Sequence, residues 1–111
     1  MKEKLQQIGE LLEELKNNKP EEIQAFLNFL QRAEKDSAIS AKNKELINVA
    51  LAVAAQCEWC IAFHTKNAIQ LGASKDEILD AGFQAVLMHG GPALMYMIPL
   101  LDAIKEFSNE G

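Results

Sequence analysis

The sequence predicts an all-α protein: a compact bundle of five or six helices that forms a single domain over residues 1–111. Apolar residues recur three and four positions apart, and Pro20, Gly72 and the segment GGP stand where helices would begin or end. Hydrophobic residues make up 49% of the chain and aromatic residues only 6%, so aliphatic side chains and alanine must fill the core. A chain of this length buries roughly two-thirds of its unfolded surface, which allows one modest core.

Two amphipathic helices are predicted at the N-terminus. The first runs over about residues 2–17 and ends in the segment NNKP. Charged residues interrupt its apolar face, so it is not expected to be a signal peptide. Pro20 opens the second, over about residues 20–34. Apolar residues share one face of each helix, namely Leu5, Ile8, Leu11, Leu12 and Leu15 in the first and Ile23, Phe26, Leu27 and Leu30 in the second.

The middle of the chain contains the longest uninterrupted helical segment. Residues 41–71 include neither glycine nor proline, so helix propensity alone predicts one helix of about thirty residues. Globular helices are usually shorter, but propensity does not indicate where this one would break. Gly72 is expected to cap its C-terminus. Ser74 is followed three residues later by Glu77, the capping-box pattern, which predicts a new helix from there to about His89.

The last helix is predicted over about residues 92–107, with a bend at Pro99. Its segment ALMYMIPLL is apolar on every side, and a small chain has little interior in which to bury it. A subunit interface would cover it, so we expect a homo-oligomer; a central helix surrounded by the others is the alternative. The apolar stretch is shorter than the roughly 20 residues that cross a bilayer, so no membrane span is expected.

Charge and compartment narrow the possible partners. The net charge of −5 leaves no basic surface for a phosphate backbone, so no nucleic-acid partner is expected. Without an export signal the expected compartment is the cytoplasm, where thiols are kept reduced. A close cysteine pair in that compartment is more often catalytic or metal-binding than structural.

The stretch QCEWCIAFH holds both cysteines of the chain, Cys57 and Cys60, and one of its two histidines, His64. On a helix Cys57 and Cys60 lie about 60° apart, and His64 lies about 40° from Cys60, so all three face one way. A helix N-terminus favours the thiolate form of a cysteine, and a histidine one turn later is placed to exchange a proton with it. These residues contain the parts of a dithiol oxidoreductase.

Other interpretations of these residues stay open. Cysteine is often buried, and a lone histidine on an apolar face is commonly a hydrogen-bonded core residue. Cys57, Cys60 and His64 are also good zinc ligands, although the fourth ligand of a structural site would have to be the distant His89 or a carboxylate. On an unbroken helix Glu45 would lie about 18 Å from Cys57. The residues alone therefore predict that Glu45 is a solvated acid.

Glu45, Cys57, Cys60 and His64 together form the pattern E-x11-C-x-x-C-x-x-x-H. With it the chain resembles the alkylhydroperoxidase D-like branch of the carboxymuconolactone decarboxylase family over about residues 22–105, after the N-terminal helix. The segments CIAFHTKNAIQLGASKDEILDA and GGPALMY are similar to segments of that family. The decarboxylase branch lacks the cysteine pair, so decarboxylase activity is not expected.

The resemblance implies a fold in which the chain turns back just before Cys57, with the cysteines at the N-terminus of a central helix. It implies an antioxidant peroxidase that reduces hydroperoxides through a redox-active Cys57–Cys60 disulfide, with Glu45 and His64 as a proton relay. No bound cofactor is implied. The reductant would be an external dithiol, such as dihydrolipoamide or a thioredoxin-like protein, and the assembly a trimer or hexamer.

Two residues depart from the family pattern. Trp59 stands between the cysteines, where the characterised peroxidase carries a further histidine, and is a candidate to line the site. His89 stands where relatives often have glycine, and is expected to pack rather than to line the site. The alternatives to a peroxidase are a disulfide reductase or electron-relay partner of a separate peroxidase, and a non-enzymatic helical oligomer that senses redox state or holds zinc.

Overall fold

The computed structural model describes residues 1–108, which form seven α-helices and no strand. The predicted all-α class is confirmed. The count exceeds the predicted five or six because two of the predicted helices are divided; α6 and α7, taken as one interrupted helix, would give six. The helices are α1 (Lys2–Asn18), α2 (Pro20–Glu34), α3 (Ala41–Ala54), α4 (Glu58–Gln70), α5 (Lys75–His89), α6 (Gly91–Met95) and α7 (Met97–Ser108).

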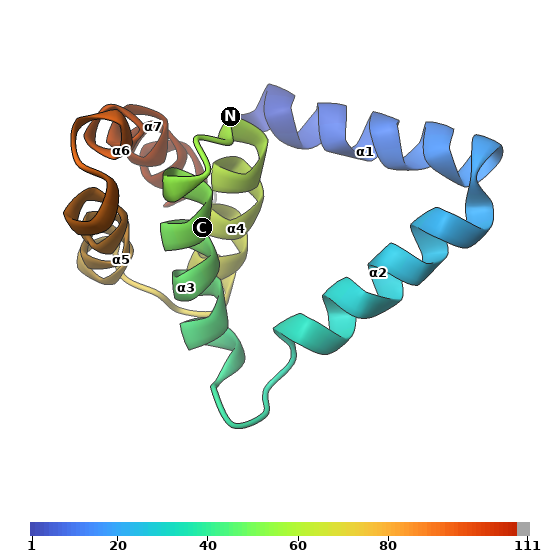
Figure 1. Ribbon diagram of the computed structural model, residues 1–111, viewed down its shortest axis with the longest axis horizontal. Helices are drawn as coiled ribbons and strands as arrows, with labels where there is room; N and C mark the ends of the chain where they lie inside the picture. The colour runs from blue at the N-terminus through green and yellow to red at the C-terminus, as the bar shows by residue number, and fades with distance from the viewer. Residues whose placement is uncertain (109–111) are drawn as a thin grey trace.

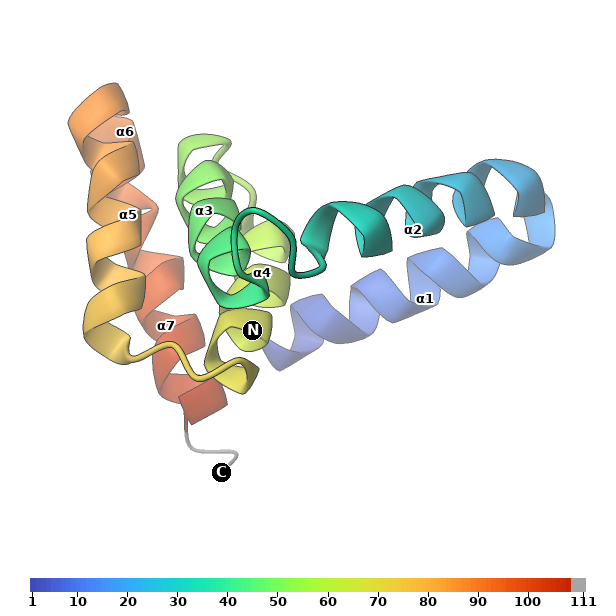
Figure 2. The same cartoon turned by 90° about the horizontal axis from the view of Figure 1, so that it is seen from below.

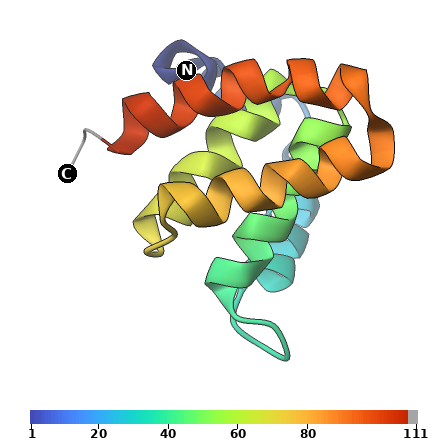
Figure 3. The same ribbon diagram turned by 90° about the vertical axis from the view of Figure 1, so that its left-hand side faces the viewer.

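Helices α3 to α7 form the compact body of the molecule. α3 packs against α4 and α5, and α4 packs against α7, so α3 and α4 lie at its centre (Figures 1 and 3). The largest fully buried aliphatic side chains come from these helices: Val49, Val53, Ile61, Ile78 and Leu100. Among residues 1–108, no helix combines the length and the apolar character that crossing a bilayer requires.

Helices α1 and α2 form a hairpin that projects from this body (Figures 1 and 2). Neither helix has a fully buried residue, although both have the predicted apolar face. Near the N-terminus of α4, the indole Nε1 of Trp59 donates to Gln7 of α1 at 2.7 Å, and the Lys4 ammonium lies 4.6 Å from the Trp59 ring centroid. At its other end, the hairpin contacts α3 and α4 through Glu34, the last residue of α2.

The single helix that propensity predicts over residues 41–71 is wrong, because the chain turns between α3 and α4. Gln56 has φ of 57°, in the left-handed region. Its N–H donates to Val53 at 3.1 Å, and the Cys57 N–H donates to Ala52 at 3.2 Å. These two bonds form the Schellman motif, which closes a helix around a left-handed residue that is usually glycine. The turn before Cys57 that the family resemblance implies is therefore present.

Gln56→Gly is expected to stabilise the fold by about 0.5–1 kcal/mol, because glycine adopts a positive φ without the steric cost that a β-carbon imposes. Urea unfolding followed by circular dichroism measures the difference. The matched control is Gln84→Gly in the interior of α5, where the same substitution should destabilise the fold by about 1 kcal/mol. If both variants were destabilised equally, the turn would not carry the conformational cost that we assign to it.

The helix boundaries predicted after α4 are confirmed. Gly72 has φ of 94° and follows the last turn of α4, with the same pair of Schellman hydrogen bonds as the turn at Gln56. Ser74 caps α5, accepting the N–H of Glu77 at 3.1 Å, while the Glu77 carboxylate accepts the N–H of Ser74 at 2.9 Å. This capping box satisfies two of the N–H groups that a helix start leaves without partners.

The last predicted helix is divided at Tyr96 rather than bent at Pro99. Proline has no N–H to donate to the residue four positions earlier, Met95, and its ring crowds that carbonyl. The helix therefore ends at Met95 as α6 and restarts at Met97 as α7. The interruption lies one turn ahead of the proline that causes it.

Candidate active site

Cys57 both ends the turn and begins α4. Its backbone is extended (φ −113°, ψ 102°), and its Sγ accepts the backbone N–H of Cys60 at 3.2 Å. The sulfur thus lies at the positive end of the helix dipole, a position that lowers the pKa of thiols in general. Cys57 and Cys60 form a disulfide with a Cα–Cα distance of 5.3 Å. The extended conformation of Cys57 permits this closure, since two cysteines inside a regular helix hold their β-carbons too far apart.

Glu45 and His64 meet across the interface of α3 and α4. Along one straight helix they would be about 28 Å apart. The turn at Gln56 makes α3 and α4 neighbours instead, and His64 Nδ1 lies 2.8 Å from Glu45 Oε1. Glu45 is only 3% exposed, so the interpretation of this residue as a solvated acid is wrong. The structure brings together the two residues that the family resemblance pairs.

Glu34 is a third member of this group that sequence reasoning did not identify. Its Oε2 lies 3.4 Å from His64 Nδ1 and accepts the side-chain N–H of Asn48 at 3.4 Å. Asn48 also donates to Glu45 Oε1 at 2.9 Å. The loop between α2 and α3 decides where Glu34 lies, and no spacing pattern in the sequence links that residue to His64.

The two carboxyl groups differ in their electrostatic surroundings. Burial works to raise the pKa of Glu45, but hydrogen bonds from His64, Asn48 and Asn67 outweigh it, and the pKa lies below its ordinary value. Burial raises the pKa of Glu34, and the adjacent Glu45 raises it further, although His64 opposes this shift. Because Glu45 is the ionised partner, it accepts the Nδ1–H of the imidazole. Nε2 of His64 is then the atom left to exchange a proton.

An apolar groove lies between the hairpin and α4. It has a volume of about 220 Å³, and Cys60 and His64 both line it, with Trp59 and Phe63 beside them. Its remaining lining residues are apolar and come from the hairpin, namely Ile8, Leu12, Phe26, Leu27 and Leu30. Cys60 is thus the sulfur that faces this groove, while Cys57 is not among its lining residues.

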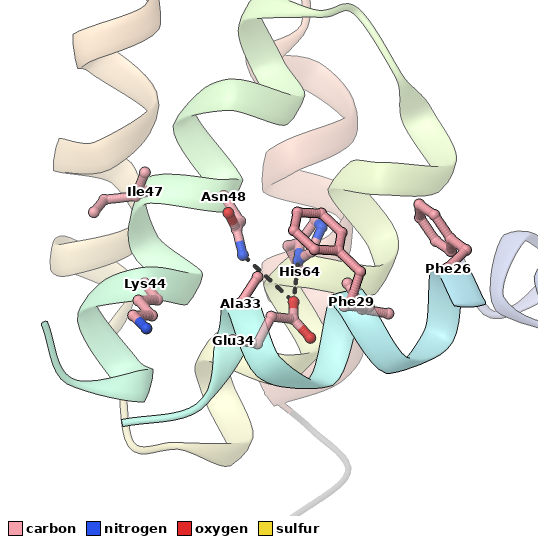
Figure 4. Close-up of a pocket in the computed structure, with 9 residues that line it drawn as sticks. Phe26, Phe29, Ala33, Glu34, Lys44, Ile47, Asn48 and His64 are labelled. Atoms are coloured by element: carbon pink, nitrogen blue, oxygen red, sulfur yellow. Dashed lines mark hydrogen bonds and ion pairs between the residues drawn. The ribbon is translucent and has the colours of Figure 1, made fainter. Parts of the chain in front are cut away.

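His64 also lines a second pocket, on the side of α2 that faces α3 (Figure 4). This pocket has a volume of about 310 Å³, and it contains the polar groups of Glu34, Asn48 and Lys44 together with Phe26 and apolar neighbours. The imidazole therefore lies where two openings converge, one apolar and the other partly polar.

The two departures from the family pattern differ in position. Trp59 is 45% exposed and lines the apolar groove beside Cys60. His89 is exposed at the C-terminal end of α5 and lines neither pocket at His64. The packing role predicted for His89 is not seen within one chain.

Glu34, Glu45 and His64 also have the chemical types of metal ligands, and one ligand atom from each lies within 4.8 Å of the others. The donors within the group, His64 Nδ1 and Asn48 Nδ2, already engage both carboxyl groups. The zinc alternative built on Cys57, Cys60 and His64 would require both sulfurs as thiolates, and here they are joined to each other.

The fold and this constellation define a helical protein with a dithiol placed beside a histidine and a carboxylate. A sequence model of the carboxymuconolactone decarboxylase family matches residues 20–103. The chain belongs to this family, and the resemblance inferred from the sequence is confirmed.

Known relatives extend this result. Two similar proteins are uncharacterised: one from Cupriavidus necator, 33% identical over 86% of this chain and 85% of its own length, and one encoded in the cox locus of Paracoccus denitrificans, 35% identical over 74% of each chain. The structure of a carboxymuconolactone decarboxylase family protein from Legionella pneumophila, in its apo form, matches with a TM-score of 0.92 and 41% identity over 96% of each chain.

A more distant structure shares the fold. It is a family protein from Thermotoga maritima for which involvement in an antioxidative response has been suggested, and it matches with a TM-score of 0.86 over 96% of this chain and 91% of its own. At 21% identity this likeness establishes a common fold and nothing finer.

Proposed function

We propose that the chain is a thiol-dependent peroxidase that reduces hydroperoxides through the Cys57–Cys60 pair, using an external dithiol as reductant and no bound cofactor. One observation carries the proposal: Cys60 and His64 line the same apolar groove, and His64 is held by the buried carboxylate of Glu45. An antioxidative role has also been suggested for the Thermotoga maritima protein that shares this fold. A reducing compartment such as the cytoplasm would supply the dithiol.

The first step requires a thiolate and a proton donor. In the reduced protein the Cys60 thiol gives its proton to Nε2 of His64, and Glu45 stabilises the imidazolium that forms. The Cys60 thiolate then attacks the terminal oxygen of the hydroperoxide, so that an S–O bond forms and the O–O bond breaks. The imidazolium returns its proton to the departing alkoxide, which leaves as an alcohol, and Cys60 remains as a sulfenic acid.

The second step forms the disulfide that the structure contains. Cys57 attacks the Cys60 sulfenic acid, the S–S bond forms and the S–O bond breaks, and the oxygen departs as water. The two cysteines have then lost two electrons and the hydroperoxide has gained two. A dithiol such as dihydrolipoamide, or a thioredoxin-like protein, restores both thiols by thiol–disulfide exchange and becomes a disulfide itself.

The test is a dithiol-dependent peroxidase assay on the purified chain. With dihydrolipoamide as reductant, we expect cumene hydroperoxide to be consumed with one alcohol formed per dithiol oxidised. Mass spectrometry of the protein should show a reversible loss of two hydrogens that maps to the Cys57–Cys60 peptide. If no hydroperoxide disappears with dihydrolipoamide or with thioredoxin and its reductase, the proposal is wrong.

A disulfide reductase or electron-relay partner of a separate peroxidase is the second candidate. The observation that favours it is Trp59, which is 45% exposed beside the disulfide and stands where the characterised peroxidase has a histidine. In such a protein dihydrolipoamide would still reduce the Cys57–Cys60 disulfide by thiol–disulfide exchange. The protein would consume no hydroperoxide unless a separate peroxidase were present. The same assay, run with and without a second peroxidase, separates the two functions.

We further propose that the chain works as a homo-oligomer, as the resemblance implies. Four large apolar side chains on α5, α6 and α7 are more than half exposed, namely Leu87 (76%), Met88 (77%), Met95 (56%) and Ile98 (61%). Apolar side chains clustered in this way are typical of protein interfaces. Light scattering of the purified chain should give the molar mass of a trimer or hexamer, and a monomeric mass at working concentration would contradict the proposal.

A further inference from the structure

Glu34 differs from the other residues of the site because it belongs to a different part of the fold. Glu45 and His64 belong to the body, whereas Glu34 ends α2 of the projecting hairpin. In Figure 4 its carboxyl group points from α2 toward both His64 and Asn48. Its side chain is 19% exposed, far less than most of the hairpin. Solvation at a helix end therefore does not explain why Glu34 lies against the second carboxylate, that of Glu45.

We propose that Glu34 is a positioning residue of the proton relay: its carboxyl group, brought by α2, holds His64 and Asn48 against Glu45 and sets how readily the imidazole serves Cys60. This role rests on the proposed function and adds a residue to it. The position of the hairpin on the body of the molecule is thereby coupled to the reactivity of the Cys57–Cys60 dithiol.

The hydrogen bonds of Glu34 depend on its protonation state. As a neutral acid it donates a hydrogen bond to the Glu45 carboxylate, and as a carboxylate it accepts from Asn48 and lies beside His64 Nδ1. The pKa of Glu34 is raised, first by burial and then by Glu45, so its neutral form persists above the usual range for a glutamate. Once ionised, Glu34 adds a second negative charge beside the imidazole and favours the imidazolium that accompanies a thiolate at Cys60.

The other ionisable groups around Glu34 come from two elements, α3 and α4. α3 contributes Glu45 and Lys44, and α4 contributes His64 and, within the groove, Cys60. The ammonium of Lys44 donates to the loop between α2 and α3 at 2.7 and 2.8 Å. α1 contributes only apolar side chains to the groove. Among the described residues, Glu34 is therefore the ionisable residue of the hairpin that contacts the proton relay of Glu45 and His64.

The experiment measures thiol reactivity instead of peroxide turnover. Reduced wild type, Glu34→Gln and Glu34→Ala are alkylated with iodoacetamide between about pH 5 and pH 8 in the presence of EDTA, and mass spectrometry gives the rate at each cysteine. The matched control is Glu22→Gln, which removes the same charge from an exposed position about 18 Å away along α2. Circular dichroism confirms that each variant is folded.

We expect the deficit of Glu34→Gln to be smallest at the acid end, where more of Glu34 is protonated, and to reach about threefold to tenfold slower reaction at Cys60 near pH 8. Glu34→Ala, which also loses the hydrogen bonds, should be slower at every pH, and Glu22→Gln should follow the wild type throughout. A Glu34→Gln profile equal to wild type, or lowered by the same factor at every pH, would overturn the proposal. Because no peroxide is used, these outcomes are independent of whether the chain is a peroxidase.

Discussion

The Cys60→Ser variant is expected to lose dithiol-dependent hydroperoxide consumption by at least about a hundredfold, the largest effect of any single substitution that we consider. A serine hydroxyl is a far weaker nucleophile than a thiolate at neutral pH, and it forms neither a sulfenic acid nor a disulfide. Cys60 is the sulfur that lines the groove, so its loss removes the atom that the hydroperoxide meets. The coupled oxidation of dihydrolipoamide, followed with cumene hydroperoxide, measures the loss.

Cys57→Ser is the matched variant, because it removes the other half of the same disulfide. It should also end multiple turnover, yet one equivalent of hydroperoxide should still oxidise Cys60, and dimedone should trap the resulting sulfenic acid. The opposite result, with a trapped sulfenic acid on Cys57 in Cys60→Ser and none in Cys57→Ser, would reverse the assignment of the attacking thiol. Full activity in Cys60→Ser would contradict the dithiol mechanism altogether.

Glu45→Gln is expected to have the second largest effect. The substitution keeps the size of the side chain but removes the charge that stabilises the His64 imidazolium, and its amide hydrogens face the donors of His64 and Asn48. We expect at least about a tenfold loss of peroxidase rate, since correctly placed proton transfer commonly contributes that much or more. Stopped-flow measurement of the first turnover isolates this step. Glu21→Gln, on the exposed side of α2, is the control.

The same variant should alter stability in a pH-dependent way. Glu45 is buried with a lowered pKa, so its carboxylate stabilises the fold above the unfolded pKa of about 4.3, and this contribution is lost as the pH falls through the lower folded value. Glu45→Gln should therefore cost about 1–3 kcal/mol at pH 7, where it leaves buried donors poorly paired, and less in acid. Urea unfolding at pH 7 and near pH 3.5 measures this difference. If the free energy of unfolding of the variant fell below that of the wild type by the same amount at both pH values, the ionisation of Glu45 would not be the source of the loss.

Two turns with the same hydrogen bonding show how far local sequence predicts this fold. The Schellman motif after α4 has glycine in its left-handed position, and Gly72 was sufficient to predict that helix end. The motif after α3 has Gln56 in the equivalent position. Glutamine is a good helix former, so local propensity argues against a turn there, and the packing of α3 on α4 must supply the compensation. Only the family resemblance indicated this break beforehand.

The amphipathic spacing, the capping box at Ser74 and the grouping of Cys57, Cys60 and His64 on one helix were determined by the sequence itself, because each depends on residues less than about two helical turns apart. The partners of His64 were decided only by tertiary structure. Glu45 is 19 positions from His64 along the chain, and it reaches the imidazole because the turn at Gln56 folds α3 back on α4. Glu34 reaches it because α2 returns to the body at its last residue. Contacts between separate helices follow from how those helices pack, and helical periodicity within each one carries no information about that.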